Sequence, residues 1–194
     1  MKMITSRHFC TLTFLVLFLS AAPGDSSSEE EEEEEEECVY TLYVQTGPMI
    51  MAGTDAKISV ALGNAEGKLV QVPDLEKWGI MERDHYYYQE GSLDVFSGRG
   101  PCIDSPLCWL NLTSDGGSQF NSWYCDFVDV TLTGPHKRCS RAFFFVLQWL
   151  STDHPPFRLN AYLDGCNLQQ QKVHTPRNGT LVVRNSVIRE GSSA

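Results

Sequence analysis

The chain has 194 residues and a formal net charge of −10, and 42% of its residues are hydrophobic. Nine consecutive glutamates, Glu29 to Glu37, carry most of that charge, so the rest of the chain stands at −1. This acidic balance argues against a nucleic-acid-binding protein, since phosphate contacts need clustered Lys and Arg. The hydrophobic content excludes a wholly disordered chain, and the length allows one ordinary domain with tails.

Residues 1–22 have the pattern of a secretory signal peptide. Lys2 and Arg7 precede an apolar segment from Phe9 to Leu19, and Ser20-Ala21-Ala22 supplies small residues for cleavage. The alternative is a membrane anchor, but a spanning helix needs about 20 apolar residues. We therefore expect cleavage near Ala22 and no transmembrane helix afterwards. The expected location is the secretory pathway, either the endoplasmic reticulum lumen or the extracellular space.

Residues 23–37 are expected to form a disordered acidic linker. After Asp25 the segment contains only Ser and Glu. Like charges repel one another and the segment has no apolar side chains to bury, so nothing favours folding.

Between Cys38 and Cys166, apolar residues form eight short runs, most of them alternating with polar residues, which predicts strands. The runs lie at residues 39–44, 57–62, 69–72, 93–96, 109–112, 128–132, 141–150 and 158–164. Clusters of Gly, Pro, Asn and Asp separate them, and no long amphipathic helix intervenes. The pattern predicts an all-β fold, an eight-stranded antiparallel β-sandwich.

Two segments depart from simple alternation. Residues 141–150 are almost continuously apolar and contain three phenylalanines, which predicts a central strand buried on both faces. Residues 74–90 lack a strand pattern and are expected to include one helical turn near residues 75–78.

Six cysteines remain once Cys10 leaves with the signal peptide, and an even number in an oxidising compartment predicts disulfide bonds. No zinc-binding spacing occurs. Six cysteines allow 15 pairings. The scheme we favour joins Cys38 to Cys166 through neighbouring first and last strands, Cys125 to Cys139 across a hairpin, and Cys102 to Cys108 around a loop.

Residues 167–194 form a polar, basic tail with a net charge of +3. Leu181-Val182-Val183 is a short apolar segment within it. A mobile tail is the expectation for such a terminus. The alternative is a basic stripe that binds anionic lipid or the acidic linker.

An ordered series of segments resembles the PLAT (lipoxygenase-homology) family. It begins with residues 38–47 and the Gly-Thr-Asp of residues 53–55, and continues through residues 94–102, 110–116, 123–124 and 148–150. The chain looks like the small secreted plant PLAT proteins linked to stress and seed development. The resemblance covers about residues 38–166. The acidic run, the tail and Cys125 have no counterpart in the pattern, which weighs against a Cys125–Cys139 disulfide.

The resemblance implies an eight-stranded β-sandwich that binds a lipid or membrane surface, or another protein, and that has no catalytic activity. It also implies a role in plant stress response or embryo development. In lipoxygenases the iron centre sits in a separate helical domain, for which this chain has no segment.

The sequence contains no recognisable catalytic motif. None of the five histidines stands in an H-E-x-x-H arrangement, and neither G-x-S-x-G nor a P-loop occurs. Two alternatives stay open: a lipid-acting hydrolase or enzyme accessory subunit with an unrecognised site, and a structural or storage protein.

Asp55 and Asp115 are candidate ligands for Ca²⁺, and the sequence indicates no other cofactor. Asp55 stands beside the carbonyls of Gly53 and Thr54, and Asp115 lies in a Ser-Asp-Gly-Gly turn sequence. If both loops lie at one end of the sandwich, they could share an ion. Some PLAT domains bind Ca²⁺ there before docking on membranes. The simpler interpretation is that both aspartates cap their own turns.

Apolar loop residues are candidates for membrane or partner contact. Met49, Ile50 and Met51 lie between the first two predicted strands, and Trp78 and the tyrosines of residues 86–88 form further clusters. Exposed apolar loops are typical of binding surfaces, and Trp and Tyr suit the membrane interface. Core packing is the alternative, favoured for Trp78 and the tyrosines.

Two glycosylation sequons occur, at Asn111-Leu112-Thr113 and Asn178-Gly179-Thr180. Asn111 alternates with Leu110 and Leu112 and is therefore expected to face outward, as a glycan requires. Asn178 lies in the tail.

Overall fold

The computed structural model describes residues 36–117, 119, 121–136, 139–167 and 180–184. These residues form nine strands and one 3₁₀ turn: β1 (Glu37–Thr46), β2 (Ile58–Gly63), β3 (Leu69–Val72), η1 (Leu75–Trp78), β4 (Leu93–Pro101), β5 (Trp109–Ser114), β6 (Trp123–Thr133), β7 (Ser140–Leu150), β8 (Asn160–Asp164) and β9 (Thr180–Arg184). Each of the eight predicted strands is present. The predicted signal peptide and nearly all of the acidic linker lie outside the described residues.

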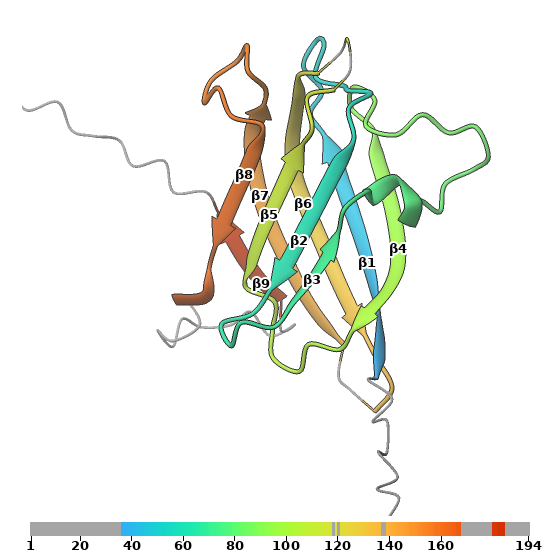
Figure 1. Ribbon diagram of the computed structural model, residues 1–194, viewed down its shortest axis with the longest axis vertical. Coiled ribbons are helices and arrows are strands. Elements are labelled where there is room, and N and C mark those ends of the chain that lie inside the picture. Colours follow the sequence, from blue (N-terminus) through green and yellow to red (C-terminus); the bar gives the residue numbers. More distant parts are fainter. Residues whose placement is uncertain (1–35, 118, 120, 137–138, 168–179, 185–194) are drawn as a thin grey trace, which may run out of the picture. The chain divides into compact units, whose positions relative to one another are not determined.

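Two sheets pack face to face (Figure 1). One has the strand order β4-β1-β6-β7-β9, and the other has the order β3-β2-β5-β8. The predicted all-β sandwich is confirmed. It carries one strand more than predicted, because Leu181-Val182-Val183 of the tail belongs to β9, which runs parallel to β7. Glu37, assigned to the linker, begins β1 and pairs with Pro101 instead.

The core lies between the sheets and is built from alternate residues of the strands. Tyr40, Leu42 and Val44 of β1 are fully buried, and Leu110 and Leu112 of β5 face them from the other sheet. Tyr40 keeps its hydroxyl satisfied by donating a hydrogen bond to the Pro101 carbonyl at 2.6 Å. Period-two alternation was therefore a correct guide to the buried faces.

The prediction that β7 is buried on both faces is wrong. Phe144 points into the core, whereas Phe143 and Phe145 lie on the outer face and are only partly buried. They cover each other there, with ring centroids 4.6 Å apart, and Phe143 also contacts Phe127 of β6. In the described part of the chain no further layer covers this face. One face of the apolar run therefore packs in the core, and the other forms an aromatic cluster on the outer surface.

The predicted cysteine pairing is also wrong. The disulfides join Cys38 to Cys102 and Cys108 to Cys166, with Cα atoms 4.9 and 4.8 Å apart. The first strand pairs with β4 and β6, whereas the strand before Cys166 pairs with β5 in the other sheet. Each disulfide thus joins the neighbouring ends of two hydrogen-bonded strands.

Cys125 and Cys139 are both free, the first buried and the second exposed. They lie on the β6–β7 hairpin, but Cys125 is opposite Gln148, whereas the residue after Cys139 is opposite Leu132. The two cysteines are therefore at opposite ends of the hairpin and cannot meet.

Antiparallel pairing brings three connections to one end of the sandwich, at residues 47–57, 115–122 and 151–159. The segment that leads into β4 joins them, and these loops lie at the top of Figure 1. Both disulfides lie at the opposite end. We call the end of the sandwich that carries the three connections the loop end.

The disulfide between Cys108 and Cys166 closes a separation of 58 residues. Replacing both cysteines with Ala is expected to lower the free energy of unfolding by about 4 kcal/mol, because the unfolded chain gains conformational freedom. Urea denaturation measures this. Cys139→Ser, a change at an exposed free thiol, is the control and should leave stability unchanged. A peptide map of the unreduced protein that linked Cys125 to Cys139 would contradict the structure.

Burial raises the pKa of Tyr40 to about 12, from an ordinary value of 10.0. The unfolded chain therefore loses this proton at lower pH than the folded one. The free energy of unfolding should accordingly be constant up to about pH 10 and fall as pH rises toward 12. Denaturation measured between about pH 9 and pH 12 tests this, with Tyr40→Phe as the comparison. That variant should show a shallower fall, and an identical one would exclude Tyr40 as a source.

Candidate functional site

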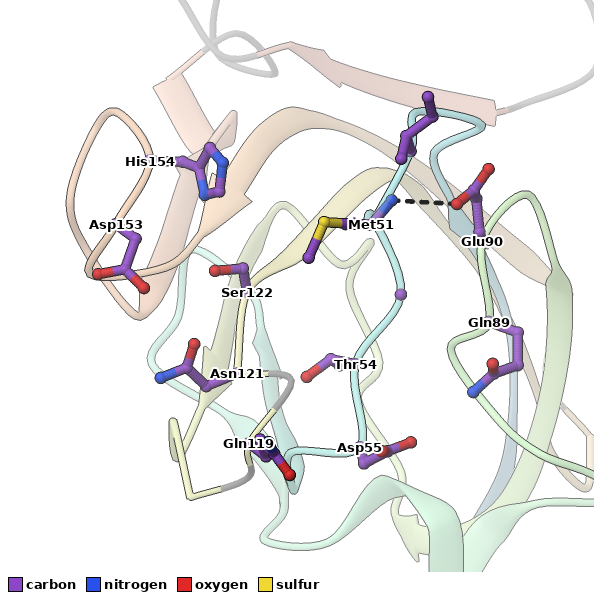
Figure 2. Close-up of a pocket in the computed structure, with 12 residues that line it drawn as sticks. Met51, Thr54, Asp55, Gln89, Glu90, Gln119, Asn121, Ser122, Asp153 and His154 are labelled. Atoms are coloured by element: carbon purple, nitrogen blue, oxygen red, sulfur yellow. Dashed lines mark hydrogen bonds between the residues drawn. The ribbon is translucent and has the colours of Figure 1, made fainter.

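A cavity of about 530 Å³ opens at the loop end (Figure 2). Four segments line it: the β1–β2 connection, the approach to β4, the β5–β6 connection and the β7–β8 connection. The lining residues are Ile50, Met51, Gly53, Thr54, Asp55, Gln89, Glu90, Gln119, Asn121, Ser122, Asp153 and His154. Five of these were predicted site residues: Ile50, Met51, Gly53, Thr54 and Asp55. The others have no sequence signal, because isolated polar loop residues follow no period.

The β1–β2 connection is held to its neighbours by backbone hydrogen bonds. The Thr54 amide donates to the Tyr88 carbonyl at 3.1 Å, and the Tyr124 amide donates to the Ala52 carbonyl at 3.0 Å. Gly53 is required here, because a Cβ would lie 2.9 Å from the Tyr88 oxygen. Thr54 is buried, and its hydroxyl oxygen accepts a hydrogen bond from the Ala56 amide. Gly53 and Thr54 therefore shape the loop.

The carboxylate of Asp94 anchors the segment on the other side of the cavity. Asp94 is fully buried and accepts hydrogen bonds from the Tyr88 amide at 2.7 Å, the Ser92 hydroxyl at 2.9 Å and His85 Nε2 at 2.6 Å. Buried carboxylates are stable only with such partners. The Asp94 bonds hold residues 85–92 in place, and with them the carbonyl that accepts from Thr54.

The tip of the β1–β2 connection exposes apolar side chains. Ile50 is 84% exposed and Met51 is 69% exposed, while Met49 is 37% exposed. A turn closed by a hydrogen bond from the Ala52 amide to the Met49 carbonyl presents them. The Met51 amide donates to a carboxylate oxygen of Glu90 at 3.0 Å, drawn as the dashed line in Figure 2. These residues were predicted as contact residues, and the fold does not bury Ile50 and Met51.

Trp78 does not belong to that exposed group. Its indole is partly buried against the core and covers Gly98 of β4, where a Cβ would lie 2.2 Å from the ring. Trp78 was proposed as a contact residue, and its packing supports the alternative of a core or rim residue. The neighbouring tyrosines diverge: Tyr86 is 76% exposed, whereas Tyr88 is fully buried.

Asp115 has the role of a turn residue. Its Oδ1 accepts hydrogen bonds from the Lys57 amide at 3.1 Å and from the Gly117 amide at 2.9 Å. Asp115 is not among the residues that line the cavity, whereas Asp55 is. In the described residues no group of three or more His, Cys, Asp or Glu side chains is placed to hold a metal ion. The shared calcium site therefore stays a prediction.

Asp55 has acidic neighbours that are distant in sequence. Burial raises the pKa of the Glu76 carboxyl, and the negative charges of Asp74, Asp55 and Asp94 raise it further. The same kind of environment acts on Tyr88, whose pKa is raised by burial and then by Glu76, Asp94 and Asp74. No spacing in the sequence indicates that η1 brings these carboxylates toward Asp55.

One serine–histidine contact lies beside the cavity. Ser151 Oγ is 3.4 Å from His154 Nδ1 and 2.8 Å from the hydroxyl of Ser122. Ser151 Oγ also accepts hydrogen bonds from the amides of Asp153 and His154, so it caps its own turn. Ser151 is fully buried, and the His154 ring stacks on Trp149. A substrate could not reach this hydroxyl, so the contact does not have the geometry of an activated nucleophile.

Of the two sequons, Asn111 lies in the middle of β5 and Asn178 lies outside the described residues. Across the described part of the chain, no helix has the length and apolar character needed to cross a bilayer.

The protein-family model described as embryo-specific protein 3 (ATS3) matches residues 25–149 of the chain. Among curated proteins, the chain is similar to PLAT domain-containing protein 1 of Arabidopsis thaliana, with 44% identity over 131 residues, 67% of this chain and 72% of that protein. PLAT domain-containing protein 3 of the same plant is 41% identical over 104 residues, 53% of this chain and 100% of that protein.

Among solved structures, the chain is similar to a LOX deletion variant in complex with arachidonate, with a TM-score of 0.46 and 20% identity. The match covers 66% of this chain and 16% of the LOX chain.

Replacing Asp94 with Asn should loosen the loop end. Asn keeps the volume but removes the charge that three donors share, so the free energy of unfolding should fall by about 1–3 kcal/mol. Hydrogen exchange at the Tyr88 amide should become faster in the variant. Asp84→Asn, at an exposed carboxylate in the same segment, is the control. Unchanged protection of the Tyr88 amide would show that another contact holds this segment.

Proposed function

Because the chain belongs to the embryo-specific protein 3 (ATS3) family and is similar to PLAT domain-containing proteins, we propose that it is a non-catalytic binding module that docks on a lipid surface. In this proposal the module works in the secretory pathway, in the endoplasmic reticulum lumen or outside the cell, during plant stress response or embryo development. A signal peptide at residues 1–22 delivers it there.

The observation that carries the proposal is the exposed apolar tip at Ile50 and Met51. Two large apolar side chains exposed at the end of a sandwich are typical of a loop that inserts into a membrane, since burying them in lipid removes apolar surface from water. Phe157 of the β7–β8 connection is 62% exposed on another loop of the same end. Most of the residues that line the cavity beside this tip are polar, which suits the headgroup layer.

The backbone at Met51 supports a role for its side chain. Met51 has a φ of +63°, in the left-handed region where glycine is the residue of least strain. A methionine that is exposed there gains little from packing in the folded protein. An unfavourable conformation kept at an exposed apolar residue is typical of a functional position.

The net charge of the sandwich determines which kind of membrane surface it would bind. Residues 38–166 carry a net charge of −5 by formal count, and the cavity is lined by Asp55, Glu90 and Asp153. Such a surface is not attracted to anionic lipid at long range. The proposed docking is therefore driven by apolar insertion, so added salt should not weaken it.

The proposal leaves the effect of calcium on docking to be measured in the binding assay. The cavity supplies the oxygen types that Ca²⁺ prefers, but its carboxylates are not gathered as a ligand set. We derive no step through the ion. An effect of calcium that disappears in Asp55→Asn would place the ion at this end of the sandwich.

Replacing Ile50 and Met51 together with Ser should reduce binding to phosphatidylcholine vesicles at least about tenfold, because two inserted apolar side chains are lost. Vesicle co-sedimentation measures this, with and without phosphatidylserine, and in calcium or a chelator. Leu69→Ser is the matched control, since Leu69 is 42% exposed at the opposite end of the sandwich.

Equal binding by the double variant and by Leu69→Ser would overturn the loop-end proposal. Absence of binding to every vesicle tested would direct attention to a protein partner instead. Turnover of an ester or lipid substrate by the purified protein would support the enzymatic alternative.

A further inference from the structure

Asn111 lies on the outer face of the four-stranded sheet, as its sequon requires. In the register of β5 it is opposite Ala61 of β2 on one side and Tyr162 of β8 on the other. Leu110 and Leu112, which flank it in sequence, are fully buried on the inner face. The Asn111 side chain thus stands between a small residue and a large aromatic one, in the middle of the sheet.

Two aromatic side chains form the surroundings of Asn111 on this face. Tyr162 is directly across the strand and is 55% exposed. Trp109 is two residues earlier on β5, and its ring centroid lies 6.1 Å from that of Tyr162, with the ring planes inclined by 37°. We call Trp109 and Tyr162 the aromatic pair.

Contacts on both sides fix the Trp109 ring. Its Nε1 donates a hydrogen bond to the Asn64 carbonyl at 3.2 Å. Its ring lies on Gly63 so closely that a Cβ there would be 2.3 Å from ring atoms. The pair is therefore a fixed surface beside Asn111, and Tyr162 keeps more than half of its area open to solvent.

The polar side chain of Asn111 has no evident part in holding the sheet together. Its Oδ1 is buried and has no hydrogen-bond partner. An unpaired buried amide oxygen disfavours folding. A strand position between Ala61 and Tyr162 would be filled at lower free energy by Thr or Val. The asparagine is thus unfavourable for the sheet but is the residue that the sequon needs.

We propose that Asn111 carries an N-linked glycan whose first sugar packs against the aromatic pair. An oligosaccharyltransferase would form the bond between Nδ2 of Asn111 and C1 of the sugar. The bond from C1 to the oxygen of a lipid pyrophosphate breaks, the pyrophosphate leaves with the electron pair, and Nδ2 loses one proton. The apolar C–H face of the sugar then covers the exposed ring of Tyr162.

The two disulfides support a location of the protein in the compartment where glycosylation takes place, since disulfides persist where oligosaccharyltransferases work. The position also leaves docking undisturbed. Asn111 is in the middle of β5, and the loop end begins after Ser114. A glycan on this sheet face keeps it hydrated and covers Tyr162, while the apolar tip at Ile50 and Met51 stays free.

The test uses the full chain secreted from a eukaryotic host, with Asn178→Gln so that one sequon remains. Mass spectrometry of the peptide that contains Asn111 should find it glycosylated, and Thr113→Val should abolish the modification. After trimming to the first sugar, the protein should melt about 3 °C higher than the same chain made without a glycan. This difference should vanish in Tyr162→Ser, because the sugar then has no exposed ring to cover.

Tyr86→Ser is the matched control, since it removes an exposed tyrosine far along the chain from β5 and should preserve the difference. An unmodified Asn111 in the secreted protein overturns the proposal. A modified Asn111 with no melting difference, or with the same difference in Tyr162→Ser as in Tyr86→Ser, overturns the packing against the aromatic pair. If Tyr162→Ser fails to fold, Tyr162→Val removes the ring with a residue that favours strands, and the difference should vanish in it but persist in Tyr162→Phe, which keeps the ring.

Discussion

The buried carboxylate of Asp94 is the interaction on which the loop end depends. Excluded from water, it is stable only because three donors converge on it, from the Tyr88 amide, the Ser92 hydroxyl and His85. Those bonds fix the chain just before β4. The Tyr88 carbonyl then accepts from the Thr54 amide, so the β1–β2 connection is positioned by the same carboxylate. One buried charge thus organises two of the segments that line the cavity.

The two ends of the sandwich are stabilised by different means. Cys38–Cys102 and Cys108–Cys166 tie adjacent strand ends together at the end opposite the cavity. The loop end has no covalent link among the described residues and relies on backbone hydrogen bonds and the Asp94 cluster. Hydrogen-bonded loops open at lower free energy than disulfide-linked strand ends. An apolar tip carried by such a loop can adjust to a surface while the sandwich below it stays fixed.

The outer surfaces of the molecule differ in the kinds of side chain that they present. The loop end presents Ile50 and Met51 beside a cavity lined largely by polar residues, and the four-stranded sheet presents Asn111 beside two aromatic rings. The five-stranded sheet presents an aromatic cluster of Phe127, Phe143 and Phe145, and the ion pair of Asp129 with Arg141 lies beside Phe127 and Phe143. Because these surfaces are separate, the proposed lipid docking and the proposed glycan attachment would use different faces, and neither would require the other to be absent. The proposed glycan would also orient the module, because a polar sugar disfavours contact of its face with lipid.

The strands and their buried faces follow from the sequence alone, because side chains alternate across a strand and the apolar set of each run must face the core. The sequence alone left open whether the β1–β2 tip is exposed or packed in the core. The turn from Met49 to Ala52 exposes it. Disulfide pairing was beyond the sequence, because it depends on which strands are neighbours, and β1 and β8 lie in different sheets. The faces of β7 were misjudged since an apolar run does not say how many layers cover it. The cavity lining, the Asp94 cluster and the aromatic pair beside Asn111 unite residues far apart in the chain, and only tertiary packing brings such residues together.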